Sequence, residues 1–272
     1  MEIMTNSIPS RRPFSPVAQW LSPLIARFPT LTYSALAMLA AFGLSLLLML
    51  VDERTVLGIN TWVKPAKFYL STGIYLLTMS WLFTQIQSWK PQRVRRWSLW
   101  LAWLLNLEIA LITLQGARGV PSHFNGDTPF DLGIFALMGI LILSATIVMG
   151  RVLWTMWTKP FPHLSRPLRW ALRLGLLLFM LASFEGGFMS QYGAHSVGVP
   201  DGGPGLPFLN WSTEGGDLRI AHFFGLHGLQ LFPLLAFALK KRNFPVQTPI
   251  VVSVATLYTL LSLGTFAWAV LQ

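Results

Sequence analysis

The chain has 272 residues, of which 53% are hydrophobic and only 11% are charged, and its formal net charge is +10 without any cysteine. Because a soluble domain carries about 25% charged residues, this composition indicates a membrane protein. The lack of cysteine excludes disulfides, thiolate metal sites, iron–sulfur clusters and covalently attached c-type haem. The basic residues flank apolar segments and form no separate domain, which argues against nucleic acid as a partner.

The first part of the chain, residues 1–30, is polar, basic and rich in proline. We expect it to form a cytoplasmic or interfacial segment in which Trp20 and Phe28 lie at the membrane surface. The apolar run that follows, residues 31–51, is 21 residues long and is not followed by a small-residue cleavage site. A secretory signal has a shorter apolar core of about 7–15 residues, so this run predicts a first transmembrane helix.

Further apolar stretches predict six more transmembrane helices, separated by loops that are rich in proline, glycine and charged residues. They cover about residues 68–86, 98–117, 132–153, 170–190, 218–239 and 249–271. The segment at 89–97 carries four basic residues and is interpreted as a loop. The fold class expected from the sequence is therefore an all-α integral membrane protein in which residues 31–272 form a single bundle of seven transmembrane helices.

The distribution of basic residues predicts the orientation of the bundle. Of the 20 Lys and Arg residues, 15 fall in the N-terminal segment and in every second connection. The positive-inside rule then places the N-terminus in the cytoplasm and the C-terminus outside. We expect a multi-pass protein of a lipid bilayer, which in a bacterium would be the inner membrane. The five basic residues on the outer side are Arg54, Lys64, Lys67, Arg118 and Arg219.

The most informative stretch is 216–233, which reads GDLRIAHFFGLHGLQLFP. On a helix, Arg219, His222, His227 and Gln230 share one sector of roughly 140°. Outside this sector lie three small residues where another helix can pack closely, namely Ala221, Gly225 and Gly228. The pattern predicts a helix with a polar inner face.

Other polar residues are expected to join this face in the outer half of the bilayer. Ionisable groups at the centre of a membrane helix cost about 2.5–3.5 kcal/mol each on insertion scales, so they usually face the bundle interior and mark function. Interhelical pairing is the structural alternative. We expect Glu108 and Glu185 to act as proton acceptors or ligands, and the remaining candidates to hold a cofactor or an anionic group (Arg118, Arg219, Gln115 and Gln230) or a metal (His222, His227, His195 and His123).

The spacing of His222 and His227 limits the kind of metal site. Helical ligands to one metal usually lie three or four residues apart, and five residues displace the two side chains by about 7.5 Å along the axis. One ion could bind both only at a local bulge, and one haem could not take both as axial ligands. Each histidine would serve a different centre, or one would bind and the other relay protons.

Three functions agree with this pattern. The first is metal- or haem-dependent redox chemistry on a lipid-soluble substrate such as a quinol, at a site that opens outward. The second is a zinc-dependent intramembrane lipid hydrolase, with three histidines on zinc and a glutamate that activates water. The third is non-enzymatic, a proton-coupled transporter or an accessory subunit of a larger membrane complex.

Two outer segments complete the expected site. The connection at 191–217 is rich in glycine and proline and is expected to fold back as a lid over the helix ends. Lys64 and Lys67 precede the second predicted helix. They would either bind a lipid phosphate or a quinone-like headgroup, or anchor the helix by snorkelling to the interface.

Overall fold

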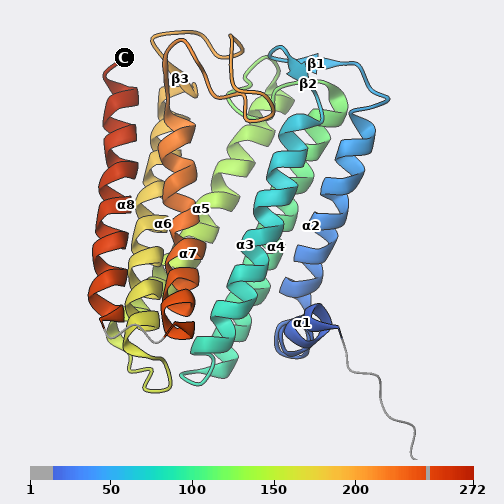
Figure 1. The fold of residues 1–272 in the computed structure, drawn as a ribbon. Coiled ribbons are helices and arrows are strands. Elements are labelled where there is room, and N and C mark those ends of the chain that lie inside the picture. The colour runs from blue at the N-terminus through green and yellow to red at the C-terminus, as the bar shows by residue number, and fades with distance from the viewer. Residues whose placement is uncertain (1–14, 243–245) are drawn as a thin grey trace, which may run out of the picture.

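The computed structural model describes residues 15–242 and 246–272, and within these ranges the chain forms eight α-helices and four two-residue strands (Figure 1). The elements in chain order are α1 (Pro16–Arg27), α2 (Pro29–Leu48), β1 (Thr55–Val56), β2 (Ile59–Asn60), α3 (Val63–Ile86), α4 (Pro91–Arg118), α5 (Pro129–Thr158), α6 (Arg166–Tyr192), β3 (Ser196–Val197), β4 (Gly216–Asp217), α7 (Leu218–Lys241) and α8 (Gln247–Val270). The expected all-α class is confirmed.

Six of the described helices are long and apolar enough to cross a membrane, namely α2, α4, α5, α6, α7 and α8. These helices support a multi-pass membrane protein. Helix α3 is 24 residues long but more polar, because it carries Lys64, Lys67 and several hydroxyl side chains. It nevertheless packs against α2 and α4 as part of the same bundle (Figure 1).

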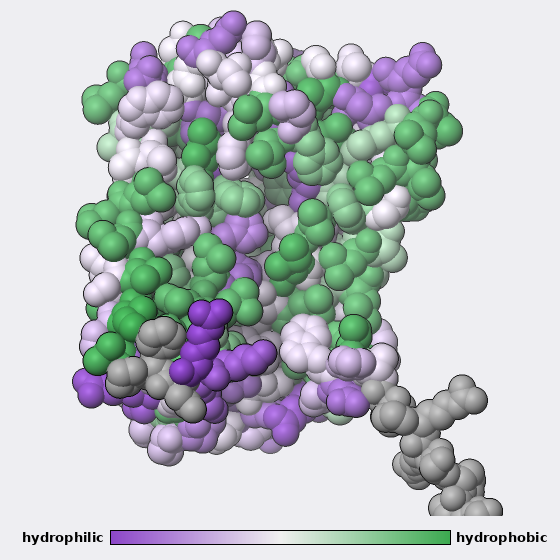
Figure 2. Space-filling model, in the orientation of Figure 1, coloured by the Kyte–Doolittle hydropathy of each residue, from purple (hydrophilic) through white to green (hydrophobic). Residues whose placement is uncertain are grey.

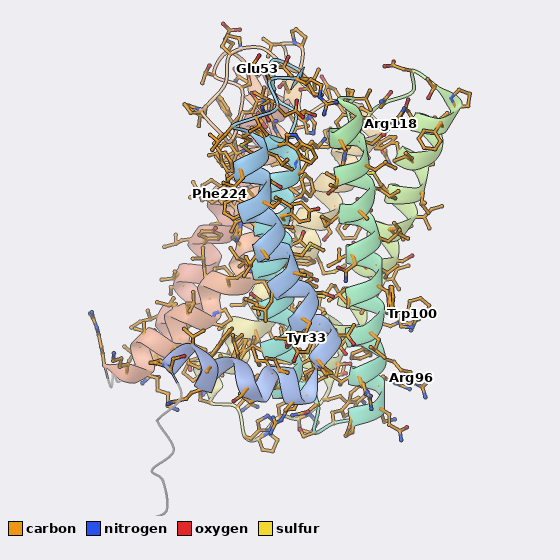
Figure 3. The ribbon with its side chains drawn as sticks, turned by 90° about the vertical axis from the view of Figure 1, so that its right-hand side faces the viewer. Tyr33, Glu53, Arg96, Trp100, Arg118 and Phe224 are labelled. Carbon is orange, nitrogen blue, oxygen red and sulfur yellow. The ribbon has the colours of Figure 1, made fainter. Side chains whose placement is uncertain are left out.

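Two details near the N-terminal side differ from the sequence-based expectation. The segment 91–97 is the beginning of α4 and not a loop, because Pro91 stands in the first turn, where its fixed φ favours a helix and no amide donor is needed. Phe28 is only 4% exposed and packs on Phe83, with ring centroids 5.8 Å apart, so it belongs to the core and not to the membrane surface. Helix α1 lies across this end of the bundle (Figure 3), whereas residues 1–14 of the expected interfacial segment lie outside the described residues.

The helices form two groups that are joined through α5. Helices α2, α3 and α4 pack together on one side, and α6, α7 and α8 pack together on the other. The closest approach is between α6 and α7, where a Cβ on Gly225 would lie 2.5 Å from the Cβ of Ala182. A Cβ on Gly228 would lie 2.8 Å from Leu178. The expectation that Ala221, Gly225 and Gly228 face another helix is thereby confirmed.

The connection after α6, residues 193–217, folds back over the bundle and is called the lid below. Strands β3 and β4 pair at its base, and Gly202 contacts Leu57 in the turn between β1 and β2. The Lys67 Nζ on α3 donates to the carbonyl oxygen of Leu209 at 2.9 Å, so the lid is tied to both helix groups. The expected packed lid is confirmed. The end that carries it is called the lid end, and the opposite end, where α1 lies, the basic end (Figure 1).

The contact between α6 and α7 yields a test of the fold. We expect Gly225→Ala to lower the thermal unfolding midpoint of the detergent-solubilised protein. Alanine gains about 1 kcal/mol in helix propensity, but overpacking against the rigid Cβ of Ala182 costs about 1–3 kcal/mol. Gly264→Ala in α8 is the matched control, because nothing lies within 4 Å of its added Cβ. An equal or higher midpoint for Gly225→Ala than for the control would contradict the close contact.

Candidate ligand site at the lid end

A cavity of about 790 Å³ lies between the two helix groups and extends inward from the lid. Helices α3 to α7 all contribute to its wall, and most of the wall is apolar, with Phe135 and Met138 from α5 and Phe179 from α6 among its residues. In Figure 2 the face between α3 and α7 is hollowed, and hydrophilic residues lie within the hollow between hydrophobic surfaces. The cavity therefore combines an apolar chamber with a polar lining along one side.

The polar face predicted for α7 forms that lining. Arg219, His222, His227 and Gln230 all line the cavity, as their shared sector on the helix implies. The His222 Nδ1 lies 2.7 Å from the carbonyl oxygen of Ala182. Because a carbonyl oxygen can only accept, Nδ1 is the donor of this hydrogen bond. This hydrogen bond fixes the ring against Gly186, where an added Cβ would lie 3.0 Å from the ring.

The lid contributes a histidine that is oriented by a carboxylate. The His195 Nδ1 donates to Asp201 Oδ2 at 2.8 Å, and the backbone amide of Ser196 donates to Asp201 Oδ1 at 2.8 Å. Burial raises the pKa of Asp201, but these hydrogen bonds outweigh it and hold the pKa below its usual range. Burial lowers the pKa of His195, which the hydrogen bond to Asp201 offsets only in part. His195 is therefore neutral at pH 7, and its Nε2 keeps a lone pair.

A second neutral histidine lies beside it in the loop between α4 and α5. His123 is packed among Phe68, Phe124 and Phe135, and its Nδ1 lies 3.0 Å from the hydroxyl of Ser122. Burial, and then the positive charge of Lys64, lower the pKa of His123 well below its usual value. Both histidines of the lid end therefore offer neutral imidazoles to the cavity.

Three cations line the same end of the cavity, but two of them have partners. Arg219 is bound by both carboxylate oxygens of Asp217, at 2.9 and 2.5 Å, and Lys67 is held by the lid carbonyl. Lys64 makes no hydrogen bond or ion pair with the described part of the chain, although it lies close enough to His123 and His195 to lower their pKa. Lys64 is therefore the cation that remains available to a ligand.

Two predicted site residues are used elsewhere in the structure. Arg118 donates to Asp131 Oδ1 at 2.5 Å and also to Gln115, and the Gln115 amide donates to the same oxygen at 2.8 Å. Neither Arg118 nor Gln115 lines the cavity. That they hold a cofactor stays a prediction; in this structure their anionic partner is the carboxylate of Asp131 in the first turn of α5.

The two intramembrane glutamates are separated by the fold. Glu108 lines the cavity, and its Oε2 is buried without a hydrogen bond. Glu185 is also buried, and neither of its oxygens has a hydrogen-bond partner, but it does not line the cavity. Glu185 therefore does not line this cavity with His222 and His227, because the residue that follows it, Gly186, occupies the wall against His222. Its expected role as a proton acceptor or ligand stays a prediction.

The histidines share the cavity without forming a cluster of metal ligands. Among the described residues, no three His, Cys, Asp or Glu side chains are grouped so that they could hold a metal ion. The Nδ1 atoms of His222, His195 and His123 are already directed at Ala182, Asp201 and Ser122. The expected metal- or haem-dependent chemistry therefore has no support in this arrangement.

Comparisons with known proteins leave the site to be interpreted from its own geometry, because no protein-family model, curated protein or solved structure matches the chain.

The residues that sequence reasoning missed are Asp201 and Asp217, which orient His195 and Arg219. Each stands within six residues of its partner, but a glycine- and proline-rich segment gives no periodicity from which such a contact could be predicted.

The lowered pKa of His123 and His195 predicts how stability depends on pH. A histidine with a folded-state pKa below its unfolded value of about 6.5 contributes fully above that pH and loses its contribution as pH falls below it. We expect the thermal midpoint in detergent to decline between pH 6.5 and 5. His123→Phe should flatten this decline, whereas His163→Phe, at the basic end, should not. An unchanged pH profile in His123→Phe would contradict the buried neutral histidine.

Proposed function

We propose that this membrane protein binds a lipid-soluble, amphipathic molecule in the lid-end cavity. The observation that carries the proposal is the division of the cavity into a largely apolar chamber and a polar end beneath the lid. Glu108 lies ten residues before the end of α4, which corresponds to a depth of about 15 Å. A ligand would place its polar group under the lid and its apolar part between α4, α5 and α6.

Access from the bilayer agrees with the surface of the bundle. The hollow between α3 and α7 opens on a side face with hydrophobic flanks (Figure 2). Leu143 and Phe184 line the cavity and are also exposed large apolar side chains. A molecule dissolved in the membrane would therefore reach the chamber without passing through water.

The groups at the polar end favour a ligand with a hydroxyl group, such as a quinol. Lys64 is a free donor, and His195 Nε2 is an acceptor whose tautomer is set by Asp201. A ligand hydroxyl could donate to His195 while its oxygen accepts from Lys64. If the proton moved to Nε2, the O–H bond would break and Lys64 would stabilise the resulting oxyanion. Recognition of a ligand hydroxyl by Lys64 and His195 is the more specific part of the proposal.

A proton-coupled transporter is the second candidate, and Glu108 is the observation that favours it. Its Oε2 is buried at the cavity wall without a hydrogen bond. A buried carboxyl without a partner is more stable in its neutral form, and it would change its protonation state when a cation or a polar substrate approached. Proton uptake by liposomes that contain the protein, lost in Glu108→Gln, would support transport.

We also propose that α3 crosses the membrane as a seventh span, with the basic end in the cytoplasm. Helix α3 has 24 residues, within the range of 20 to 30 residues of the six apolar helices; it packs against α2 and α4 and begins with the two lysines of the lid end. Its hydroxyl-rich side, with Ser71 and Thr72, lines the cavity and so avoids lipid. The 15-to-5 division of Lys and Arg supports the orientation.

The proposed recognition of a hydroxyl predicts the effect of Lys64→Gln. A hydrogen bond to a charged group contributes about 1.5–3 kcal/mol, so we expect decyl-hydroquinone to bind about ten- to a hundredfold more weakly to the variant. Quenching of tryptophan fluorescence in nanodiscs would measure binding. Lys240→Gln at the basic end is the matched control. The dimethyl ether of the same quinol cannot donate to His195 and should bind the unchanged protein more weakly than the quinol does, and equal binding of quinol and ether to the unchanged protein would contradict the proposal.

The topology is tested by reporter fusions at four positions. Fusions after Arg96, Arg166 and Lys241 should report the cytoplasm, and one after Gly203 in the lid should report the outside. One further fusion, after Gly58 between α2 and α3, tests α3 itself: a signal from the same side of the membrane at Gly58 and at Arg96 would contradict its role as a span. A cytoplasmic signal at Gly203 would contradict the orientation.

A further inference from the structure

A second cavity, of about 1020 Å³, lies at the basic end between the first half of α4 and the second half of α5. It is separate from the lid-end site, since the two cavities have no lining residue in common. Basic side chains converge on it from both helices and from the connections that flank them, namely Lys90, Arg93, Arg96, Arg151 and Lys159. We call this cavity the basic pocket.

The charges of the basic pocket are not balanced by the described part of the protein. None of its five cations takes part in an ion pair there, whereas Arg54, Arg118 and Arg219 at the lid end each bind an aspartate. Every described Asp and Glu lies at the lid end or within α4 or α6. The basic pocket therefore concentrates positive charge that a bound anion would neutralise.

Aromatic side chains shape the basic pocket as a site at the membrane interface. The Nζ of Lys90 and the Cζ of Arg93 each lie 5.6 Å from the ring centroid of Trp89, which holds both cations on one aromatic surface. Trp100 and Trp154 also line the pocket and are 61% and 70% exposed. Exposed tryptophans of a membrane protein lie at the level of the lipid headgroups. In Figure 3, Arg96 and Trp100 project from the same side of α4, away from the bundle.

The remaining wall provides for an apolar part of the ligand. Leu104 on α4 and Ile147 and Val148 on α5 line the pocket on the side of the bundle centre. A molecule with its anionic group among the five cations could therefore extend its acyl chains along α4 and α5 toward the bilayer core. This combination distinguishes the site from one for a small soluble anion, which would make no use of apolar walls or of tryptophans exposed to lipid.

We infer that the basic pocket binds the headgroup of an anionic phospholipid from the adjacent leaflet. Arginine matches a phosphodiester with two parallel hydrogen bonds, and the pocket carries three arginines. Five uncompensated cations favour a headgroup with two phosphates over one with a single phosphate. The expected order of affinity is diphosphatidylglycerol, then phosphatidylglycerol, then phosphatidylcholine.

A general preference of basic residues for this side of a membrane does not account for the pocket. Other basic residues at the same end lie outside it or are engaged by the protein, as is Arg173, which donates to the carbonyl oxygen of Met156 at 2.9 Å. Lys240, Lys241 and Arg242 end α7 and do not line the basic pocket. They supply an internal control with the same charge at the same end of the molecule.

The test compares two triple variants of the full chain by native mass spectrometry in detergent with defined lipids. Arg93→Gln, Arg96→Gln and Arg151→Gln together should weaken diphosphatidylglycerol binding at least tenfold. Lys240→Gln, Lys241→Gln and Arg242→Gln remove the same charge and should change it less than twofold. An equal loss of diphosphatidylglycerol binding in both variants would show that net charge alone causes the effect, and this result would overturn the proposed site.

Two measurements on the unchanged protein keep the inference falsifiable if the arginine variant does not fold. At equal mole fractions, diphosphatidylglycerol should be retained at least tenfold more than phosphatidylcholine, and a ratio near one would overturn the inference. Inorganic phosphate at millimolar concentration should not displace the lipid. Displacement by phosphate would assign the pocket to a soluble anion and would likewise overturn it.

Discussion

The close contact between α6 and α7 determines where the rest of the structure can place its polar groups. Because Gly225 allows α7 to approach Ala182 on α6, the small residues of α7 are used for packing. Its polar residues line the space between the two helix groups, where His222 also keeps a hydrogen bond to the carbonyl oxygen of Ala182 on α6. Across that space, Tyr75 on α3 and Phe179 on α6 stack with ring centroids 5.3 Å apart. Such large side chains hold α3 and α6 farther apart than the glycine contacts hold α6 and α7. The cavity is thus a consequence of uneven helix packing.

The two ends of the bundle manage charge in opposite ways. At the lid end, aspartates of the connections and of the first turn of α5 bind Arg54, Arg118 and Arg219, so that little free charge remains near the cavity. In such surroundings Lys64, which has no partner among the described residues, is the side chain that we propose for recognition of a ligand. At the basic end the described chain supplies no carboxylate, and several cations stay uncompensated. The lid end is therefore suited to a weakly polar group and the basic end to a strongly anionic one.

The sequence predicted the helices and the polar face of α7 well, because both follow from periodicity and from the cost of placing polar groups in lipid. It did not place Arg118, Gln115 and Glu185 relative to the cavity, which none of the three lines. Helical periodicity shows which residues share a face, but not which neighbouring element that face contacts. Arg118 binds Asp131 on α5, and Glu185 precedes Gly186, the residue that packs against His222 at the cavity wall. The partner of His195 was not predictable either, since Asp201 reaches it through an irregular turn of the lid.

The charge balance also explains why the two proposed sites would not compete for one ligand. A phospholipid with a doubly charged headgroup would find Arg219 and Lys67 already engaged beneath the lid, by Asp217 and by the carbonyl oxygen of Leu209, and would meet fewer free cations there than in the basic pocket. A neutral quinol would gain little from five hydrated cations, because it has no charge with which to neutralise them. If both proposals hold, each site would favour its own ligand through the charges that surround it. The bundle would then hold a structural lipid in one leaflet while a different molecule exchanges through the cavity in the other.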